Sequence, residues 1–302
     1  MKTVTKGRGV SRRGDSGATA EKTRRGMSVR ALVPFFGLTF GLSWGVLALL
    51  ILLPDQIEAI FGELNSTNPL FILAVYSPGI AGVLLVWWHY GLRGLGNFFR
   101  RLTLWRMPVP WWVFLVIGIP AIVYVGAAIS GTFTDPFPFS TLYATLSALT
   151  FALLLGPIEE LGWRGVGLPL LQRRLAPLWS GLILGVAWAT WHAPAFLLSG
   201  TPQSTWSFVP FFVGVVMLSV VLTPMFNAAG GSILIAVLFH FQAMNPIMPD
   251  AQPWDTLIWI IAAVVIVVIN RKSMLTRKGA VTEVLMPGEE GSLDNNRVTA
   301  NS

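Results

Sequence analysis

Apart from residues at the ends of the stretches, five ionisable side chains lie within the long apolar stretches of this 302-residue sequence: Glu159, Glu160, Arg164, His192 and His240. A charge at the centre of a bilayer costs about 2.5–3.5 kcal/mol on insertion scales, so such residues face the protein interior, pair with one another and mark a functional site. We therefore treat these five as the candidate site and the rest of the chain as what positions them.

Three of the five form the pattern Glu159-Glu160-x-x-x-Arg164. On a helix, Glu160 and Arg164 are four residues apart with the acid first, which is the favourable order for an ion pair. Glu159 points about 100° away on a helix and is less easily neutralised by Arg164. The pattern predicts one carboxylate held by Arg164 and a neighbour free to act as a general base. A Glu–Arg clamp that only joins two helices is the alternative.

The two histidines lie on different apolar segments. His192 is followed by Pro194, which bends or ends a helix, and His240 is followed by Gln242 and Asn245. A lone histidine in a membrane span is often a core residue that forms an interhelical hydrogen bond. Two histidines together with an unpaired acid favour a reactive site instead.

One carboxylate and two imidazoles are suited to two kinds of chemistry. Glu159 can deprotonate a water while His192 and His240 stabilise the oxyanion formed when that water attacks a carbonyl. Alternatively, the same three side chains can ligate a divalent metal ion such as zinc that activates the water. The sequence therefore predicts hydrolysis of a peptide bond in or beside the membrane, with or without a metal.

The segments that position these residues are predicted to span a membrane. Only 12% of residues are charged and 54% are hydrophobic, whereas about 25% of the residues in a soluble domain are charged. The absence of cysteine excludes disulfides and cysteine-based metal sites. We predict an all-α bundle of about eight transmembrane helices, from eight apolar stretches: 31–54, 68–89, 109–133, 141–164, 178–199, 206–226, 231–248 and 254–270.

The distribution of charge predicts the orientation. With eight spans, 20 of the 21 Lys and Arg residues fall on the side of the two termini, Arg164 being the exception. The charged residues of the opposite loops are all acids: Asp55, Glu58, Glu63, Asp135, Asp250 and Asp255. By the positive-inside rule both termini are cytoplasmic. The basic excess therefore indicates contact with the lipid bilayer and not with nucleic acid.

Outside the membrane domain, residues 31–270, we predict two disordered tails. Residues 1–30 are basic with little apolar content, and residues 271–302 are polar. The apolar run after the N-terminal tail has about 24 residues and no small-residue cleavage site, so it is expected to be a retained span and not a signal peptide. Met27 is an alternative first residue.

These motifs resemble those of the CPBP family of intramembrane endopeptidases, which includes proteases that trim prenylated CAAX tails and proteins linked to bacteriocin immunity. Glu159, Glu160 and Arg164 match its first motif. Its second motif is an aromatic residue four before a histidine, here Trp188 and His192, where the family usually has Phe. The resemblance covers residues 140–250.

The third motif of the family is a histidine with an asparagine four residues later. Here Met244 stands four residues after His240 and Asn245 stands five after it, so either Asn245 or Gln242 is expected to fill that role. The resemblance implies that Glu159 activates water, that Glu160 with Arg164 supports it, and that the histidines and Asn245 bind the oxyanion or a metal. It also implies a membrane-associated protein or peptide as substrate, and the plasma membrane of a prokaryote as location.

Two other functions would use the same residues. An ion-coupled transporter also places Glu, Arg and His inside its bundle, although the sequence shows no internal repeat. A non-catalytic membrane scaffold or maturation factor would keep the motif for stability alone. For any of them, Glu159, His192 and His240 meet at one depth only if helices tilt or bend, and Gly156-Pro157 predicts a kink just before the acids.

Overall fold

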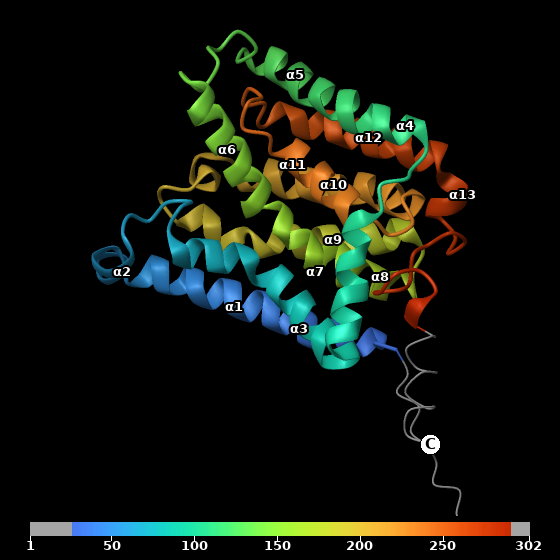
Figure 1. Ribbon diagram of the computed structural model, residues 1–302. Helices are drawn as coiled ribbons and strands as arrows, with labels where there is room; N and C mark the ends of the chain where they lie inside the picture. The colour runs from blue at the N-terminus through green and yellow to red at the C-terminus, as the bar shows by residue number, and fades with distance from the viewer. Residues whose placement is uncertain (1–25, 291–302) are drawn as a thin grey trace, which may run out of the picture.

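The computed structural model describes residues 26–290, and all regular elements in that range are helices (Figure 1). The predicted all-α class is therefore confirmed. The α-helices are α1 (Leu32–Leu52), α2 (Pro54–Phe61), α3 (Pro69–Arg100), α4 (Val109–Val113), α5 (Ile119–Ser130), α6 (Leu142–Leu155), α7 (Glu160–Gly162), α8 (Leu168–Gln172), α9 (Pro177–Trp191), α10 (Phe208–Ala228), α11 (Ile233–Ala243), α12 (Trp254–Ile269) and α13 (Arg271–Met274).

Each of the eight predicted apolar stretches contains a helix. Among the described residues, five helices are long and apolar enough to cross a membrane: Val29–Leu52, Pro69–Thr103, Val109–Ser130, Leu142–Gln172 and Phe208–Ala228. The apolar helices α11 and α12 are shorter. The packed surfaces of these helices form one continuous apolar core with large buried residues such as Trp163, Phe35 and Phe239 at its centre.

The span that bears the two acids is longer than predicted, and it is not a regular α-helix. It runs from Leu142 to Gln172 and not to residue 164, because the apolar sequence after Arg164 continues the helix. A 3-10 turn, Pro157–Glu159, follows Gly156, and a π-helical turn, Trp163–Gly167, follows α7. The 3-10 turn lies at the predicted Gly156-Pro157 kink, whereas the π-helical turn follows the acids, and Glu159 lies near the middle of the span.

Glycines bring this irregular segment against the backbone of α3. A Cβ atom added to Gly162 would lie 2.1 Å from the carbonyl oxygen of Pro78, and one added to Gly82 would lie 2.8 Å from that of Leu161. A Cβ atom on Gly79 would meet the carbonyl oxygen of Ile158 at 2.8 Å. The two segments therefore pack backbone to backbone, an approach that side chains would prevent.

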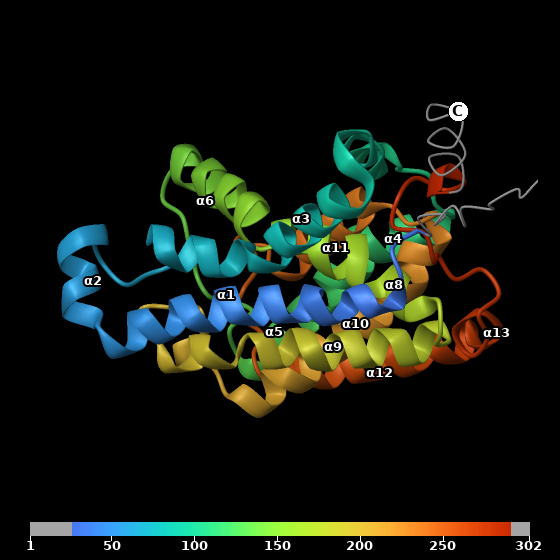
Figure 2. The same cartoon turned by 90° about the horizontal axis from the view of Figure 1, so that it is seen from below.

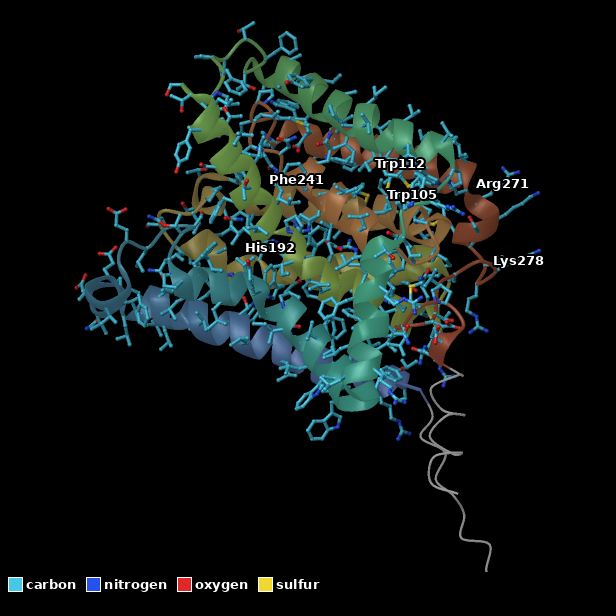
Figure 3. The ribbon with its side chains drawn as sticks, viewed as in Figure 1. Trp105, Trp112, His192, Phe241, Arg271 and Lys278 are labelled. Carbon is cyan, nitrogen blue, oxygen red and sulfur yellow. The ribbon has the colours of Figure 1, made fainter. Side chains whose placement is uncertain are left out.

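The bundle has two ends, which Figures 1 and 2 both separate. At one end lie the start of α1, α8, α13 and the segment 275–290; we call this the chain-end face. At the other lie α2 and the loops 131–141, 198–207 and 244–253; we call this the loop face. With side chains drawn in the view of Figure 1, Arg271 and Lys278 lie at the chain-end face, on the outside of the molecule (Figure 3).

The prediction that residues 271–302 are a disordered tail is wrong for residues 271–290, which lie at the chain-end face. Residues 271–274 form α13, and the following segment packs on the bundle with Val284 and Leu285 almost fully buried. The sequence prediction failed here because the apolar run around Val284 and Leu285 is short and is followed by Pro287 and Gly288, which does not predict a helix or a span. Met27, in the predicted N-terminal tail, is also buried. Residues 1–25 and 291–302 of the two tails lie outside the described residues.

Candidate active site

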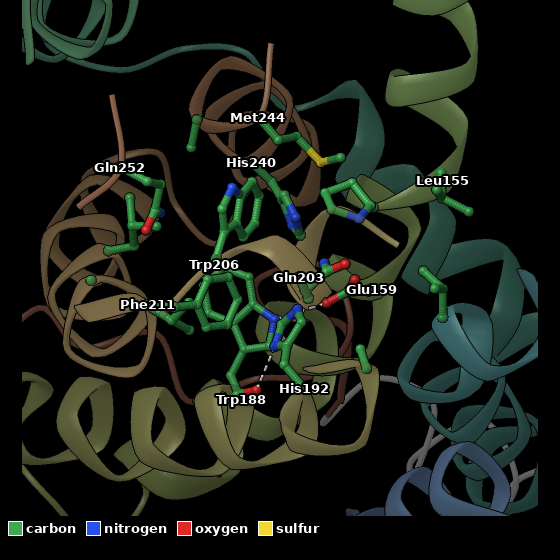
Figure 4. A pocket seen from close by; sticks show the side chains of 18 of the residues that line it. Leu155, Glu159, Trp188, His192, Gln203, Trp206, Phe211, His240, Met244 and Gln252 are labelled. Carbon is green, nitrogen blue, oxygen red and sulfur yellow. Dashed lines mark hydrogen bonds between the residues drawn. The ribbon is translucent and has the colours of Figure 1, made fainter. Parts of the chain in front are cut away.

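An internal cavity of about 590 Å³ lies in the half of the bundle nearer the loop face (Figure 4). Its walls are the second half of α1, the start of α3, the ends of α6, α9 and α11, the starts of α10 and α12, and the loops between them. Glu159, His192 and His240 all line this cavity. The structure therefore brings together three candidate residues that lie far apart in the sequence.

Two tryptophans hold the carboxylate of Glu159. The indole N–H of Trp188 donates to Glu159 Oε2 at 2.8 Å, and that of Trp163 donates to the same oxygen at 3.2 Å. Glu159 is 3% exposed, so these bonds replace water around the carboxylate. Its other oxygen, Oε1, has no partner among the described residues and is left for a ligand in the cavity.

Glu160 forms the centre of a buried charged triad. Arg164 Nη1 donates to Glu160 Oε1 at 3.0 Å, as the four-residue spacing predicts. His240 Nδ1 lies 2.8 Å from the same oxygen. Glu160 and Arg164 are both fully buried. The pair thus connects the irregular fourth span to α11 and fixes the imidazole of His240 by one nitrogen.

Trp188 contacts most of the candidate residues. Besides its bond to Glu159, its ring lies 4.5 Å from the guanidinium carbon of Arg164, a cation–π contact. The ring centroids of His240 and His192 are 5.2 Å and 6.0 Å from that of Trp188. The tryptophan therefore separates and orients the charged groups, and a phenylalanine at this place would keep the ring but lose the N–H donor.

The hydrogen bonds of the histidines determine what each can offer to the cavity. His192 Nδ1 lies 2.8 Å from the backbone oxygen of Trp188, one helical turn earlier. A carbonyl oxygen only accepts, so Nδ1 carries the proton and Nε2 of the neutral ring is an acceptor. His240 donates Nδ1–H to Glu160, and when protonated it also presents Nε2–H as a donor.

The third motif is displaced by one residue, as the sequence indicates. Met244 and Asn245 both line the cavity, whereas Gln242 is not part of its wall. Asn245 Nδ2 donates to Gln242 Oε1 at 3.1 Å, and Asn245 Oδ1 accepts from the backbone N–H of Ile247. Gln242 therefore orients Asn245, and Asn245 is the amide that reaches the cavity.

The donor set does not fit a metal centre as the side chains are placed. Among the described residues, no three His, Asp or Glu side chains are close enough together to hold a metal ion. Glu159 Oε1 and one nitrogen each of His192 and His240 are free beside the cavity, but these three donors are not placed closely enough to act together as the three protein ligands of a zinc site.

Sequence reasoning missed the two donors to Glu159. Trp163 is four residues after Glu159, so the i,i+4 rule for helical neighbours was a signal that could have found it. Trp188 was noted only as a departure from the usual Phe. Because it is 29 residues from Glu159 in the sequence, only the fold brings the two side chains together.

Comparison with known proteins agrees with this geometry. Residues 140–244, which contain all three motifs up to Met244, match the family described as type II CAAX prenyl endopeptidase, Rce1-like. This match supports the resemblance of residues 140–244 to the CPBP family of intramembrane proteases.

The chain is also similar to a curated relative, CAAX prenyl protease 2 of the archaeon Methanococcus maripaludis. The two sequences are 27% identical over 184 residues, which cover 57% of this chain and 66% of the relative. The chain thus spans just under two thirds of that relative's length. The region that matches the family model, residues 140–244, includes the acids and histidines around the cavity, and the apolar helices are those of a membrane protein.

Proposed function

We propose that this protein is an intramembrane endopeptidase in which Glu159 activates the attacking water. The observation that supports the proposal is the state of its carboxylate. Oε2 is held by two indole donors, while Oε1 is free beside a cavity large enough for a peptide segment. An anchored base with one free oxygen can take a proton from a water without losing its position.

The two imidazoles have different roles in this proposal. His192 Nε2 accepts a hydrogen bond from the same water and orients it toward the scissile carbonyl. His240, protonated and held by Glu160, donates Nε2–H to the oxyanion. Asn245 is a second donor to the oxyanion, and Arg164 stabilises the charge of Glu160. The reaction uses these side chains and no metal.

The substrate would be a membrane-associated protein or peptide that reaches the cavity from within or beside the lipid bilayer. The named activity of the archaeal relative makes a prenylated CAAX tail one candidate, and a membrane-bound peptide of another kind is a second. We further propose that both termini are cytoplasmic, from the distribution of Lys and Arg, and that the protein resides in the plasma membrane of a prokaryote.

The test is the substitution Glu159→Gln, which keeps shape and hydrogen bonding but removes the base. Membranes that contain wild-type protein or the variant at matched levels are compared by mass spectrometry of peptide termini. We expect termini that the wild type generates to fall by about 100-fold or more in the variant, the size of a general-base contribution.

Glu58→Gln is the matched control, because Glu58 is an exposed glutamate on α2, outside the cavity wall. It should generate the wild-type termini. Identical termini in all three membranes, with all proteins folded, would contradict the protease proposal and favour a scaffold or a carrier. Loss of cleavage on adding a chelator to the wild type would contradict the metal-free reaction.

A further inference from the structure

The cavity extends well beyond the three candidate catalytic residues, and its remaining ionisable groups are all acids. Besides Glu159 and the two histidines, Asp250 and Asp255 line it, and no lysine or arginine does. Both aspartates belong to the loop face, at the end of α12 where the cavity approaches the surface. The part of the cavity away from the catalytic residues is therefore negatively charged.

Four residues of the cavity wall have a buried side-chain oxygen without a hydrogen-bond partner. They are Ser43 Oγ, Gln203 Oε1, Gln252 Oε1 and Asp255 Oδ1. Ser43 is only 1% exposed. Buried polar atoms in folded proteins nearly always have partners, because leaving one unpaired costs about 1–3 kcal/mol. All four are oxygens, and the three from Gln and Asp can only accept, so what they lack is a donor.

Asp255 is the charged member of this group. It lies in the first turn of α12, where the helix dipole favours an acid, and its side chain is half-buried. None of the salt bridges formed among residues 26–290 involves Asp255 or Asp250. The helix dipole therefore accounts for an acid at this position but not for a cavity-lining carboxylate oxygen that has no partner.

We propose that Asp255 anchors a substrate subsite that binds a basic side chain, lysine or arginine, of the peptide cleaved at Glu159. The inference rests on the proposed function and adds the class of substrate. An ammonium or guanidinium group supplies Asp255 with a hydrogen-bond donor and the opposite charge in one group. The loops of the loop face contain acids and no lysine or arginine, so the surface potential also draws a basic segment to this end.

A binding experiment tests the subsite separately from catalysis. The full-length Glu159→Gln protein is placed in nanodiscs of phosphatidylcholine, whose neutral headgroups do not bind basic peptides electrostatically. Fluorescent apolar peptides of one length contain a single lysine, acetyl-lysine or norleucine, and that residue is moved along the peptide in a series. We expect the best lysine peptide to bind about tenfold more tightly than its acetyl-lysine and norleucine counterparts.

Variants of Asp255 assign the preference to this residue. Asp255→Asn should remove the preference for lysine and leave the Kd of the norleucine peptide unchanged, and Asp255→Glu should retain the preference. Asp135→Asn is the matched control, because Asp135 is an exposed acid of the loop face that does not line the cavity. It should bind all peptides as the parent protein does.

Equal binding of the three peptide types would overturn the proposal, and this comparison needs no Asp255 variant to fold. An unchanged lysine preference in Asp255→Asn, with only a lower melting temperature, would assign the aspartate to the helix dipole and would also overturn it. Failure of the protease proposal looks different. Lysine peptides would then bind through Asp255, and the wild-type protein would cleave none of them.

Discussion

Arg101 and Arg164 are both fully buried guanidinium groups, but their surroundings differ. Arg101, at the chain-end face, donates to the backbone oxygens of Gly231 at 2.9 Å, Gly165 at 2.8 Å and Val284 at 2.7 Å. Its partners are neutral and come from three separate segments of the chain. Arg164 does not line the cavity itself. Among the described residues it has a carboxylate partner in Glu160, while its Nε and Nη2 atoms have no partner.

This difference indicates two uses of a buried cation. Arg101 donates hydrogen bonds to backbone oxygens that helix ends and turns leave without a partner, and thereby holds the segment 275–290 against the bundle. Arg164 instead contributes charge: it neutralises Glu160 and lies over the ring of Trp188. Complete pairing thus accompanies the structural role of Arg101, and incomplete pairing accompanies the role proposed for Arg164. The two residues are neighbours, since Arg101 Nη2 donates to the backbone oxygen of Arg164 at 3.5 Å.

The largest effect should come from breaking the buried pair of Glu160 and Arg164. Arg164→Gln leaves Glu160 buried without its cation, which costs about 3–5 kcal/mol. The double variant Glu160→Gln/Arg164→Gln removes both charges and should recover much of that loss. Thermal unfolding in detergent measures both. If the single and double variants were equally unstable, the pair would not be coupled and Arg164 would be structural like Arg101.

Removing Arg101 should have the next largest effect, and it should be local. Arg101→Met keeps the length of the side chain but leaves three backbone oxygens unpaired, at a cost of about 3 kcal/mol in total. We expect the segment 281–285 to become open to hydrogen–deuterium exchange and to proteolysis, because Val284 loses its anchor.

The same variant should keep the catalytic cavity. Peptide termini generated by Arg101→Met membranes at low temperature should match those of the wild type. Loss of cleavage while the segment 281–285 stays protected would contradict a purely structural role for Arg101.

The smallest effect should come from the indole donors. Trp188→Phe restores the residue that the family usually has, keeps the ring over Arg164 and removes only the 2.8 Å bond to Glu159. We expect kcat to fall about tenfold, the value of one bond to a charged group. Trp163→Phe removes the longer, 3.2 Å bond and should cost less. Melting temperatures should change little in either variant, and the reverse order of kcat values would contradict the geometry.

The sequence predicted those features that depend on neighbours along the chain. The Glu160–Arg164 pair follows from four-residue spacing, and Glu159 is outside that pair as expected. The helices follow from long continuous apolar stretches, because a helix satisfies its backbone hydrogen bonds within one segment in lipid. The common cavity of Glu159, His192 and His240 was inferred from their chemistry and from the family motifs, since spacing alone could not show it.

Features that depend on the fold were not predictable in the same way. The bond from Trp188 to Glu159 joins residues 29 positions apart, and Arg101 meets Val284 across 183 positions. A polar segment that packs through two buried residues, Val284 and Leu285, has no periodic signal. The site residues meet at one depth because of the 3-10 and π-helical turns on either side of α7. The sequence indicated a kink only at the first of these turns.

The glycine contacts between α3 and the acid-bearing segment have a mechanical consequence. With Gly162 against the carbonyl of Pro78 and Gly82 against that of Leu161, there is no side-chain layer that could deform. A rotation that carried Glu159 out of the cavity would force backbone atoms into one another. The two acids therefore lie on a rigid wall. Because Trp188 of α9 and His240 of α11 are bonded to these acids, the motion that admits a peptide is left to the loops 198–207 and 244–253, which also line the cavity.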